Sequence, residues 1–277
     1  MDHIFLDEAG YCGLMQAASL FTNGVPVTFL GDHMQLPPVS QLDDDALRSA
    51  AERGGRLCYG YLWSLSALYS EQLIGDGPGS LARAFVEGSE PSMVRTQRYD
   101  LTDSHRFGEN LARVLDRFVY GNGMTGSASG DLSITCIDAV CDHRDGRENA
   151  AEAEAVRDFL RREMPDPADV AILTPYSAQL TLLRRRVGRK YRDCVMTVHG
   201  SQGREWDTVV FSVADNGVVS RDVPFRFTSS ESLVGMRVIN TAVSGAKRRL
   251  VMVCDREFWM NRDGELIGGI LRESIPE

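Results

Sequence analysis

Two short apolar runs, each ending in acidic and small residues, decide the predicted fold: Ile4-Phe5-Leu6-Asp7-Glu8-Ala9-Gly10 and Phe29-Leu30-Gly31-Asp32-His33-Met34-Gln35-Leu36-Pro37-Pro38. Short apolar runs bounded by turn signals are typical of buried parallel strands. In open α/β sheets, ligands bind just beyond the carboxyl ends of such strands. The two runs therefore predict neighbouring parallel strands with a ligand site at the edge where both end.

The acidic residues after these runs suit nucleotide hydrolysis. Asp7 and Glu8 follow the first predicted strand, where one carboxylate can bind Mg²⁺ and the next can orient a water molecule. Asp32 and Gln35 follow the second strand, close enough to sense the terminal phosphate of a nucleotide. An acidic pair after an apolar run is also common without any catalytic role. The order of the two runs, one helix-length apart, favours the catalytic interpretation.

The other half of such a site would be a glycine-rich loop ending in Gly-Lys-Ser/Thr. No Gly-Lys pair occurs in the 277 residues. Met1 lies almost on the first strand, and the residues before Ser89 supply too few strands for a complete sheet. We therefore expect the carboxyl-terminal portion of a longer protein, with the phosphate loop on an upstream segment or on a separate chain.

Composition is that of an ordinary globular protein, with 43% hydrophobic residues and a net charge of −9. This acidic balance argues against coating nucleic acid by bulk electrostatics, so any contact must use a local basic groove. Six cysteines without a Cys-x-x-Cys pair predict thiols of a reducing compartment. A metal cluster of Cys136, Cys141 and His143 is the less favoured alternative. Without a signal peptide or membrane span, we expect a cytoplasmic protein with no membrane partner.

Alternating strand and helix patterns predict a mostly parallel sheet in the second part of the chain. Length allows two domains. We place a partial lobe at residues 1–95 and a complete lobe at residues 96–277, with the boundary inside Ser89–Tyr99. Strands are expected at Val27–Leu30, Leu132–Ile137, Val170–Leu173, Cys194–Val198, Thr208–Val213 and Leu250–Cys254. Helices are expected at Tyr11–Phe21, Leu62–Leu73, Asn149–Glu163 and Ser232–Ser244, in a segment that ends near Tyr120, and across Arg184–Arg192. We also expect a flexible loop at Gly121–Gly130 and a peripheral helical tail at Arg256–Glu273.

Six motifs follow one another along the chain: Asp7-Glu8-Ala9-Gly10, Gly31-Asp32-x-x-Gln35-Leu36-Pro37-Pro38, Ser104-His105-Arg106-Phe107, Thr174-Pro175-Tyr176-x-x-Gln179, Ser201-Gln202-Gly203-Arg204-Glu205 and Ala246-Lys247-Arg248-Arg249-Leu250. In this order they resemble superfamily 1 helicases, nearest to the group typified by the nonsense-mediated-decay RNA helicase and its DNA-acting relatives. The match covers most of the chain. The resemblance implies an α/β fold of the P-loop NTPase class, with RecA-like parallel sheets and flanking helices, as one partial lobe followed by one complete lobe.

The resemblance also implies roles in ATP hydrolysis. Asp7 would bind Mg²⁺ and Glu8 would activate the attacking water. Gln35, next to Asp32, would couple the γ-phosphate to the nucleic-acid groove, and Arg106 would contact the γ-phosphate from the second lobe. Phosphoryl transfer depends mostly on positioning and charge stabilisation, so these residue types suit the reaction. From the residue alone, a surface arginine at a helix start is the preferred interpretation of Arg106, and the motif context favours the catalytic role.

Further residues match the family's phosphate and nucleic-acid motifs. Gly203 and Glu205 would touch phosphate and ribose. Asn149 and Glu152 fit the family's Asn-x-x-Glu-Ala helix start. The residues that would contact single-stranded nucleic acid, or line its groove, are Thr174, Tyr176, Gln179, Thr197 and His199.

The last motif departs from the family pattern. Members usually have Ala-Leu-Thr-Arg-Ala followed by Lys or Arg, whereas this chain has Ala242-Val243-Ser244-Gly245-Ala246-Lys247-Arg248. Gly245 thus stands where an arginine approaches the γ-phosphate. An arginine finger is worth orders of magnitude in rate, so Lys247 or Arg248 would have to substitute for it.

Two weaker signals leave alternatives open. Six positive charges within Arg184–Arg192 could track a phosphate backbone or form a solvated helix face. Trp206 and Tyr176 could stack on bases or be partly buried.

Three functions are compatible with these residues. The first is an ATP-dependent helicase or translocase, moving 5′ to 3′ on single-stranded nucleic acid, with DNA favoured over RNA. The second is a degenerate, non-catalytic module that binds nucleic acid or protein. The third, a metal-dependent nuclease using Asp7 and Glu8, lacks further clustered ligands. In every case we expect little or no ATP hydrolysis by the chain alone.

Overall fold

The computed structural model describes residues 2–12, 20, 24–37, 99–141, 147–218 and 225–276. The chain divides into two compact units, Met1–Tyr99 and Asp100–Glu277. The expected helix at Tyr11–Phe21 lies largely outside the described residues. The expected helix at Leu62–Leu73 and all of Ser89–Tyr99 except Tyr99 itself also lie outside them, as does His143.

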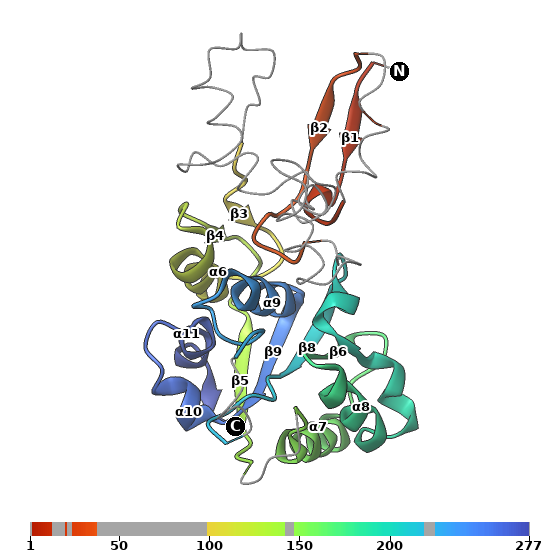
Figure 1. Ribbon diagram of the computed structural model, residues 1–277, viewed down its shortest axis with the longest axis vertical. Helices are drawn as coiled ribbons and strands as arrows, with labels where there is room; N and C mark the ends of the chain where they lie inside the picture. Colours follow the sequence, from red (N-terminus) through yellow and green to blue (C-terminus); the bar gives the residue numbers. More distant parts are fainter. Residues whose placement is uncertain are drawn as a thin grey trace, which may run out of the picture. The chain divides into compact units, whose positions relative to one another are not determined.

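In the first unit, the two apolar runs form neighbouring parallel strands, as predicted (Figure 1). Strand β1 (Ile4–Leu6) pairs with β2 (Val27–Phe29), with Leu6 opposite Phe29. The pairing continues past the strands, because the backbone N–H of Leu30 donates to the Leu6 carbonyl at 2.8 Å. A short 3₁₀ helix, η1 (Ala9–Tyr11), follows β1.

The second unit is built on a six-stranded sheet in the order β10-β5-β9-β8-β6-β7, in which every pairing is parallel. Its central strands are apolar and buried on both faces, the pattern expected of a parallel sheet covered by helices. Strand β9 starts earlier than predicted and includes three basic residues. The strands are β5 (Ser133–Asp138), β6 (Val170–Thr174), β7 (Val195–Thr197), β8 (Trp206–Ser212), β9 (Ala246–Cys254) and β10 (Ile275–Pro276).

Helices cover the sheet in two groups. The chain moves along the sheet in one direction from β5 through β6 to β7, and in the other from β8 through β9 to β10. Because parallel crossovers are right-handed, the connecting helices of the two series cover opposite faces. One group is α7 (Ala150–Glu163) and α8 (Ser177–Arg186), and the other is α9 (Leu233–Ser244), α10 (Arg256–Met260) and α11 (Leu266–Arg272).

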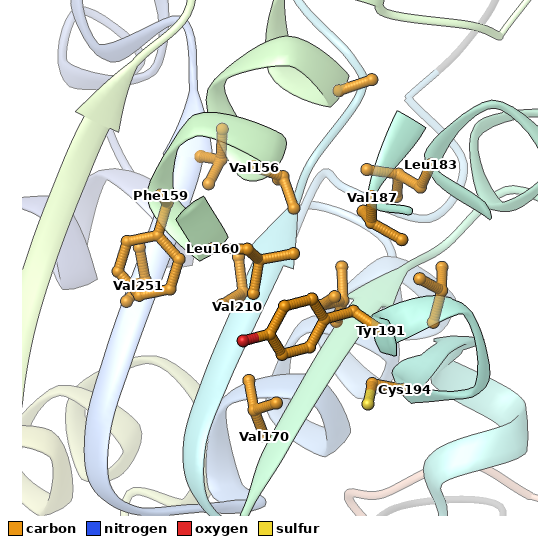
Figure 2. Packing of buried hydrophobic residues seen from close by; sticks show 14 of the residues in the cluster. Val156, Phe159, Leu160, Val170, Leu183, Val187, Tyr191, Cys194, Val210 and Val251 are labelled. Atoms are coloured by element: carbon orange, nitrogen blue, oxygen red, sulfur yellow. The ribbon is translucent and has the colours of Figure 1, made fainter. Parts of the chain in front are cut away.

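Figure 2 shows the core beneath α7 and α8. Phe159 and Leu160 of α7 pack with Leu183 of α8, over Val210 and Val251 of the sheet, and all five side chains are at most 2% exposed. The helix that these side chains anchor was predicted at Asn149–Glu163 from the alternation of strand and helix patterns.

The Arg184–Arg192 segment is not one helix, contrary to the prediction. Helix α8 ends at Arg186, and Gly188 has a φ of 79°, which interrupts the helical backbone. A 3₁₀ helix, η4 (Arg189–Cys194), follows. The charges are therefore divided between two short segments, and Arg184 bonds the Val195 carbonyl at 2.9 Å.

The Gly121–Gly130 stretch is more ordered than predicted. It contains strand β4 (Thr125–Gly126), which pairs with β3 (Asp103–Ser104). It follows α6 (Glu109–Leu115) and a π-helical turn, η3 (Asp116–Tyr120). The Asp116 carboxylate accepts backbone N–H groups of Asn122, Gly123 and Met124 at 2.8–3.0 Å, bonds that lower its pKa and hold the turn.

The carboxyl-terminal tail is helical as predicted but not peripheral. Leu266, Ile267, Ile270 and Leu271 of α11 are all fully buried, as is Trp259 of α10. Over the described ranges, no helix is long and apolar enough to cross a membrane. In that same part of the chain, no group of three His, Cys, Asp or Glu side chains could hold a metal ion.

Candidate functional site

Because β1 and β2 are parallel, Asp7 and Glu8 after β1 and Asp32 and Gln35 after β2 follow the same edge of this two-stranded sheet. Two glycines permit the approach: a Cβ on Gly31 would lie 2.9 Å from the Ala9 nitrogen, and one on Gly10 would lie 2.7 Å from the Asp32 carbonyl oxygen. Real side chains do not tolerate such contacts with backbone. The segments that carry Asp7 and Asp32 are therefore held in direct backbone contact.

At this edge, the carboxylates of Asp7 and Asp32 also accept hydrogen bonds from the backbone of their own loops. The exposed Asp7 carboxylate accepts the backbone N–H of Glu8 at 2.9 Å, and Glu8 itself has a left-handed φ of 51°. The Asp32 carboxylate accepts the N–H of Met34 at 2.8 Å, and the Gln35 N–H bonds the Asp32 carbonyl at 3.3 Å. Mg²⁺ commonly binds through one or two carboxylates together with water and substrate phosphates. The exposed Asp7 carboxylate fits that mode.

A second cluster, in the other unit, joins residues predicted from three different motifs. The Arg106 guanidinium bonds Glu205 at 2.9 Å and the Ser244 carbonyl at 3.0 Å. The Lys247 ammonium lies 3.7 Å from Glu205 and 3.6 Å from Asp207. We call these four side chains, Arg106, Glu205, Asp207 and Lys247, the charge cluster.

The charge cluster lies at the amino ends of β8 and β9. The Trp206 N–H donates to the Gly245 carbonyl at 3.0 Å, which ties the start of β8 to the end of α9. Gly203, with a φ of 71°, makes the turn into β8. Arg248 is 81% exposed and its guanidinium lies 3.5 Å from Asp207, at the outer side of the cluster.

Gly245 leaves room for a side chain. Its backbone, with a φ of −75° and a ψ of −10°, suits any residue. A Cβ there would meet nothing nearer than the Arg204 carbonyl oxygen at 3.5 Å, an ordinary contact. No steric demand of the fold therefore requires glycine where the family has arginine.

The predicted nucleic-acid residues lie at the carboxyl ends of β6 and β7. Thr197 and His199 are partly exposed, and the Thr197 hydroxyl accepts the Gly200 N–H at 3.3 Å, capping the 3₁₀ helix η5 (Val198–Ser201). Burial lowers the pKa of His199. Thr174 and Gln179 are fully buried, and Tyr176 is only 8% exposed.

Gln179 belongs to a buried network around Glu152. The Gln179 amide bonds the Asn149 carbonyl at 3.1 Å and the Ser212 hydroxyl at 3.0 Å. Glu152, 0% exposed, accepts the Ser212 hydroxyl at 2.6 Å and the Ala214 N–H at 2.9 Å. Asn149 caps α7 by accepting the Glu152 N–H at 3.1 Å. The Asn-x-x-Glu pattern is thus an internal scaffold that ties α7 to α8 and to the end of β8.

The sequence of this chain is similar to those of known helicases. A family profile described as an AAA domain matches residues 133–257. An uncharacterized ATP-dependent helicase from Methanocaldococcus jannaschii is 33% identical over 262 residues, which cover 91% of this chain and 35% of that protein. The DNA replication ATP-dependent helicase/nucleases JHS1 of Arabidopsis thaliana and DNA2 of Saccharomyces cerevisiae are 24% and 22% identical, each over 91% of this chain.

These similarities support a superfamily 1 helicase-like group for the chain. It spans 19%, 35% and 17% of the length of the Arabidopsis, Methanocaldococcus and yeast relatives. Among solved structures, an arterivirus helicase in complex with DNA is similar over 91% of this chain and 39% of its own, with a TM-score of 0.45 and 15% identity.

Three further residues near the candidate site were not predicted from the sequence: Arg204, Asp215 and Phe227. Arg204, whose guanidinium lies 5.0 Å from the Trp206 ring centre, stands inside a motif already noted. Asp215 follows the end of β8 as Asp7 follows β1, so the same carboxyl-end signal could have found it. Phe227 lies in a loop without a motif, and no sequence signal marks it.

Glu152 makes the stability of the helicase-like unit depend on pH. Burial raises its pKa to about 8 from an ordinary 4.5, with smaller contributions from Asp215 and Asp255. The folded chain therefore holds a proton that the unfolded chain releases. The resulting stabilisation is complete below about pH 4.5 and is lost as pH rises to about 8, with a slope of up to about 1.4 kcal/mol per unit.

Replacing Glu152 by Gln is expected to flatten this dependence. The amide keeps the shape of the neutral acid, and its oxygen can still accept a hydrogen bond from Ser212 or Ala214, but it does not titrate. Between about pH 5.5 and pH 7.5, the wild type should lose on the order of 1 to 3 kcal/mol more unfolding free energy than Glu152→Gln, measured by urea denaturation. His199 titrates alike in both proteins and cancels. Parallel curves would show that Glu152 is charged in the folded chain.

Proposed function

We propose that this chain is part of an ATP-dependent helicase or translocase that couples ATP hydrolysis to 5′-to-3′ movement along single-stranded nucleic acid, with DNA favoured over RNA. The observation that carries the proposal is the meeting of Arg106, Glu205 and Lys247 in one charge cluster. Cations collected from separated motifs suit the terminal phosphate of a nucleotide. The names of the Arabidopsis and yeast relatives, both DNA replication helicases, support DNA as the substrate.

In this proposal the first unit holds the metal and the water. Asp7 holds Mg²⁺, which when bound neutralises charge on the phosphates. Glu8 takes a proton from the attacking water, and Gln35, beside Asp32, senses the γ-phosphate. The phosphate loop comes from an upstream segment or from a separate chain, because no glycine in this sequence is followed by lysine.

The second unit supplies positive charge. Arg106 and Lys247 are held by Glu205 and turn toward the γ-phosphate when nucleotide is present. Lys247 takes the place of the arginine missing at Gly245, with Arg248 as an outer contributor. Gly203 and Glu205 border the phosphate and ribose.

The second candidate function is a non-catalytic module that binds nucleic acid or protein. The observation that favours it is Gly245, since neither packing nor backbone geometry demands glycine there. In that case the charge cluster would be a structural ion-pair network.

Binding measurements on the 277-residue chain test the proposal. We expect it to bind a single-stranded oligodeoxynucleotide more tightly than a duplex, with an affinity that falls as salt rises, because phosphate contacts release counterions. We expect little ATP turnover by the chain alone. The Glu8→Gln variant serves as control: turnover that depends on Glu8 would show that the phosphate cradle lies within this chain. Absence of single-strand binding at low salt would contradict the proposal.

A further inference from the structure

Two buried acids fasten the short segment between β8 and α9. The Thr228 hydroxyl donates to Asp215 at 2.6 Å, and the Ser229 hydroxyl donates to Glu265 at 2.7 Å. The Ser230 N–H also bonds Glu265 at 2.7 Å. Asp215 and Glu265 are both fully buried. Hydrogen bonds to buried carboxylates are strong, so this part of the segment has a fixed conformation.

An aromatic anchor holds the other end of the segment. The Phe225 ring packs 5.7 Å from the ring centres of both Phe258 and Trp259. The Trp259 indole N–H donates to the Asp215 carbonyl at 3.0 Å. The backbone on both sides of Phe227 is therefore fastened to the core of the unit.

Phe227 itself remains partly exposed between these anchors. Its ring lies 5.7 Å from Tyr176 and 6.3 Å, edge-on, from His199. The exposed Arg226 places its guanidinium 5.4 Å from the Phe227 ring centre. Behind it, Arg147 lies 4.6 Å from the Tyr176 ring and pairs with Asp215. Asp215 is thus buried and bonded, while Arg226 and part of the Phe227 ring reach the surface.

We propose that Phe227, with His199 at its edge, is a stacking surface for one base of a single-stranded nucleic acid, and that Arg226 contacts the neighbouring phosphate. The inference rests on the proposed function and assigns a site to it. A ring held in advance loses little conformational entropy when a base stacks on it. Stacking on an aromatic face is tolerant of sequence, as movement along a strand requires. Tyr176, which is buried, supports Phe227 from below instead of touching the base.

Substitution of Phe227 separates stacking from packing. Phe227→Leu keeps an apolar contact with Tyr176 but has no aromatic face. We expect it to bind an oligo(dT) strand about tenfold more weakly than wild type, equivalent to about 1.4 kcal/mol, with an unchanged midpoint of urea unfolding. Phe227→Trp should retain wild-type affinity. A strand with abasic sites should bind wild type and Phe227→Leu equally, because it has no bases to stack.

The added tryptophan gives a second, direct readout. Fluorescence of Phe227→Trp, corrected for the wild-type signal, should be quenched by oligo(dT) and not by the abasic strand. Equal oligo(dT) binding by wild type and Phe227→Leu, or an unquenched tryptophan in the complex, would overturn the stacking surface and leave the proposed function standing. Failure of the wild type to bind any single strand would overturn both.

Discussion

Replacing Arg106 by alanine is expected to lower kcat for ATP hydrolysis by about 10³-fold or more in an ATP-hydrolysing protein that contains both units of this chain. The Arg106 side chain is 40% exposed and bonds the side chain of Glu205 and the backbone carbonyl of Ser244, so its loss should hardly affect folding. Its removal would also leave Glu205 without its closest counter-ion. Steady-state hydrolysis, with the unfolding midpoint measured alongside, checks the prediction.

Three variants sharpen this test. Arg113→Ala removes another exposed arginine of the same unit, paired with Glu273 at 2.9 Å, and should leave kcat unchanged. Arg106→Lys keeps the charge but cannot span both Glu205 and the Ser244 carbonyl, so it should recover only part of the rate. Arg106→Ala combined with Glu205→Gln should be less impaired than Arg106→Ala if unpaired negative charge contributes. Normal turnover in Arg106→Ala would remove this residue from the site.

The local parts of the fold were predictable from the sequence. Apolar runs that end in acidic residues predicted β1 and β2, and the alternation of strand and helix patterns predicted α7 with Asn149 at its start. These features depend on residues close together in the sequence and, for α7, on the burial of one helical face. The same logic failed where a single backbone conformation decides the outcome: the left-handed Gly188 ends the basic helix.

Features that depend on distant residues were not predictable. Arg106 and Glu205 are 99 positions apart, and nothing near either residue indicates their ion pair. The buried α11 contains only a few apolar residues, too short a run to show that the fold would cover it on every side. Glu152 looks like a surface residue of an exposed helix start, whereas it is buried against Ser212 and Ala214, which are 60 and 62 positions away in the sequence. Motif resemblance placed Arg106 and Glu205 in one site; only the folded chain shows their contact.

Replacing Glu152 by alanine is expected to destabilise the second unit by about 3 to 5 kcal/mol. The carboxyl group is the acceptor for the Ser212 hydroxyl, the Ala214 N–H and the Asn149 amide, at 2.6, 2.9 and 3.0 Å. All three donors are buried, and each unsatisfied buried group costs about 1 to 3 kcal/mol. Against a total stability of about 5 to 15 kcal/mol, this loss leaves the folded state marginal. Urea denaturation near pH 6 measures it.

The same substitution should also loosen the proposed stacking surface. Ala214 has a φ of 68°, a left-handed conformation that is unfavourable for a residue with a Cβ, and Glu152 holds it there. Asp215, which anchors Thr228, comes next in the chain. Glu152→Gln keeps an acceptor for Ala214 and should lose far less stability. The affinities for a single strand are compared at a urea concentration where Glu152→Ala is still folded. Glu152→Ala should then bind the strand more weakly than Glu152→Gln, although residue 152 is fully buried. Equal stability of the alanine and glutamine variants would show that the buried bonds do not support this part of the fold.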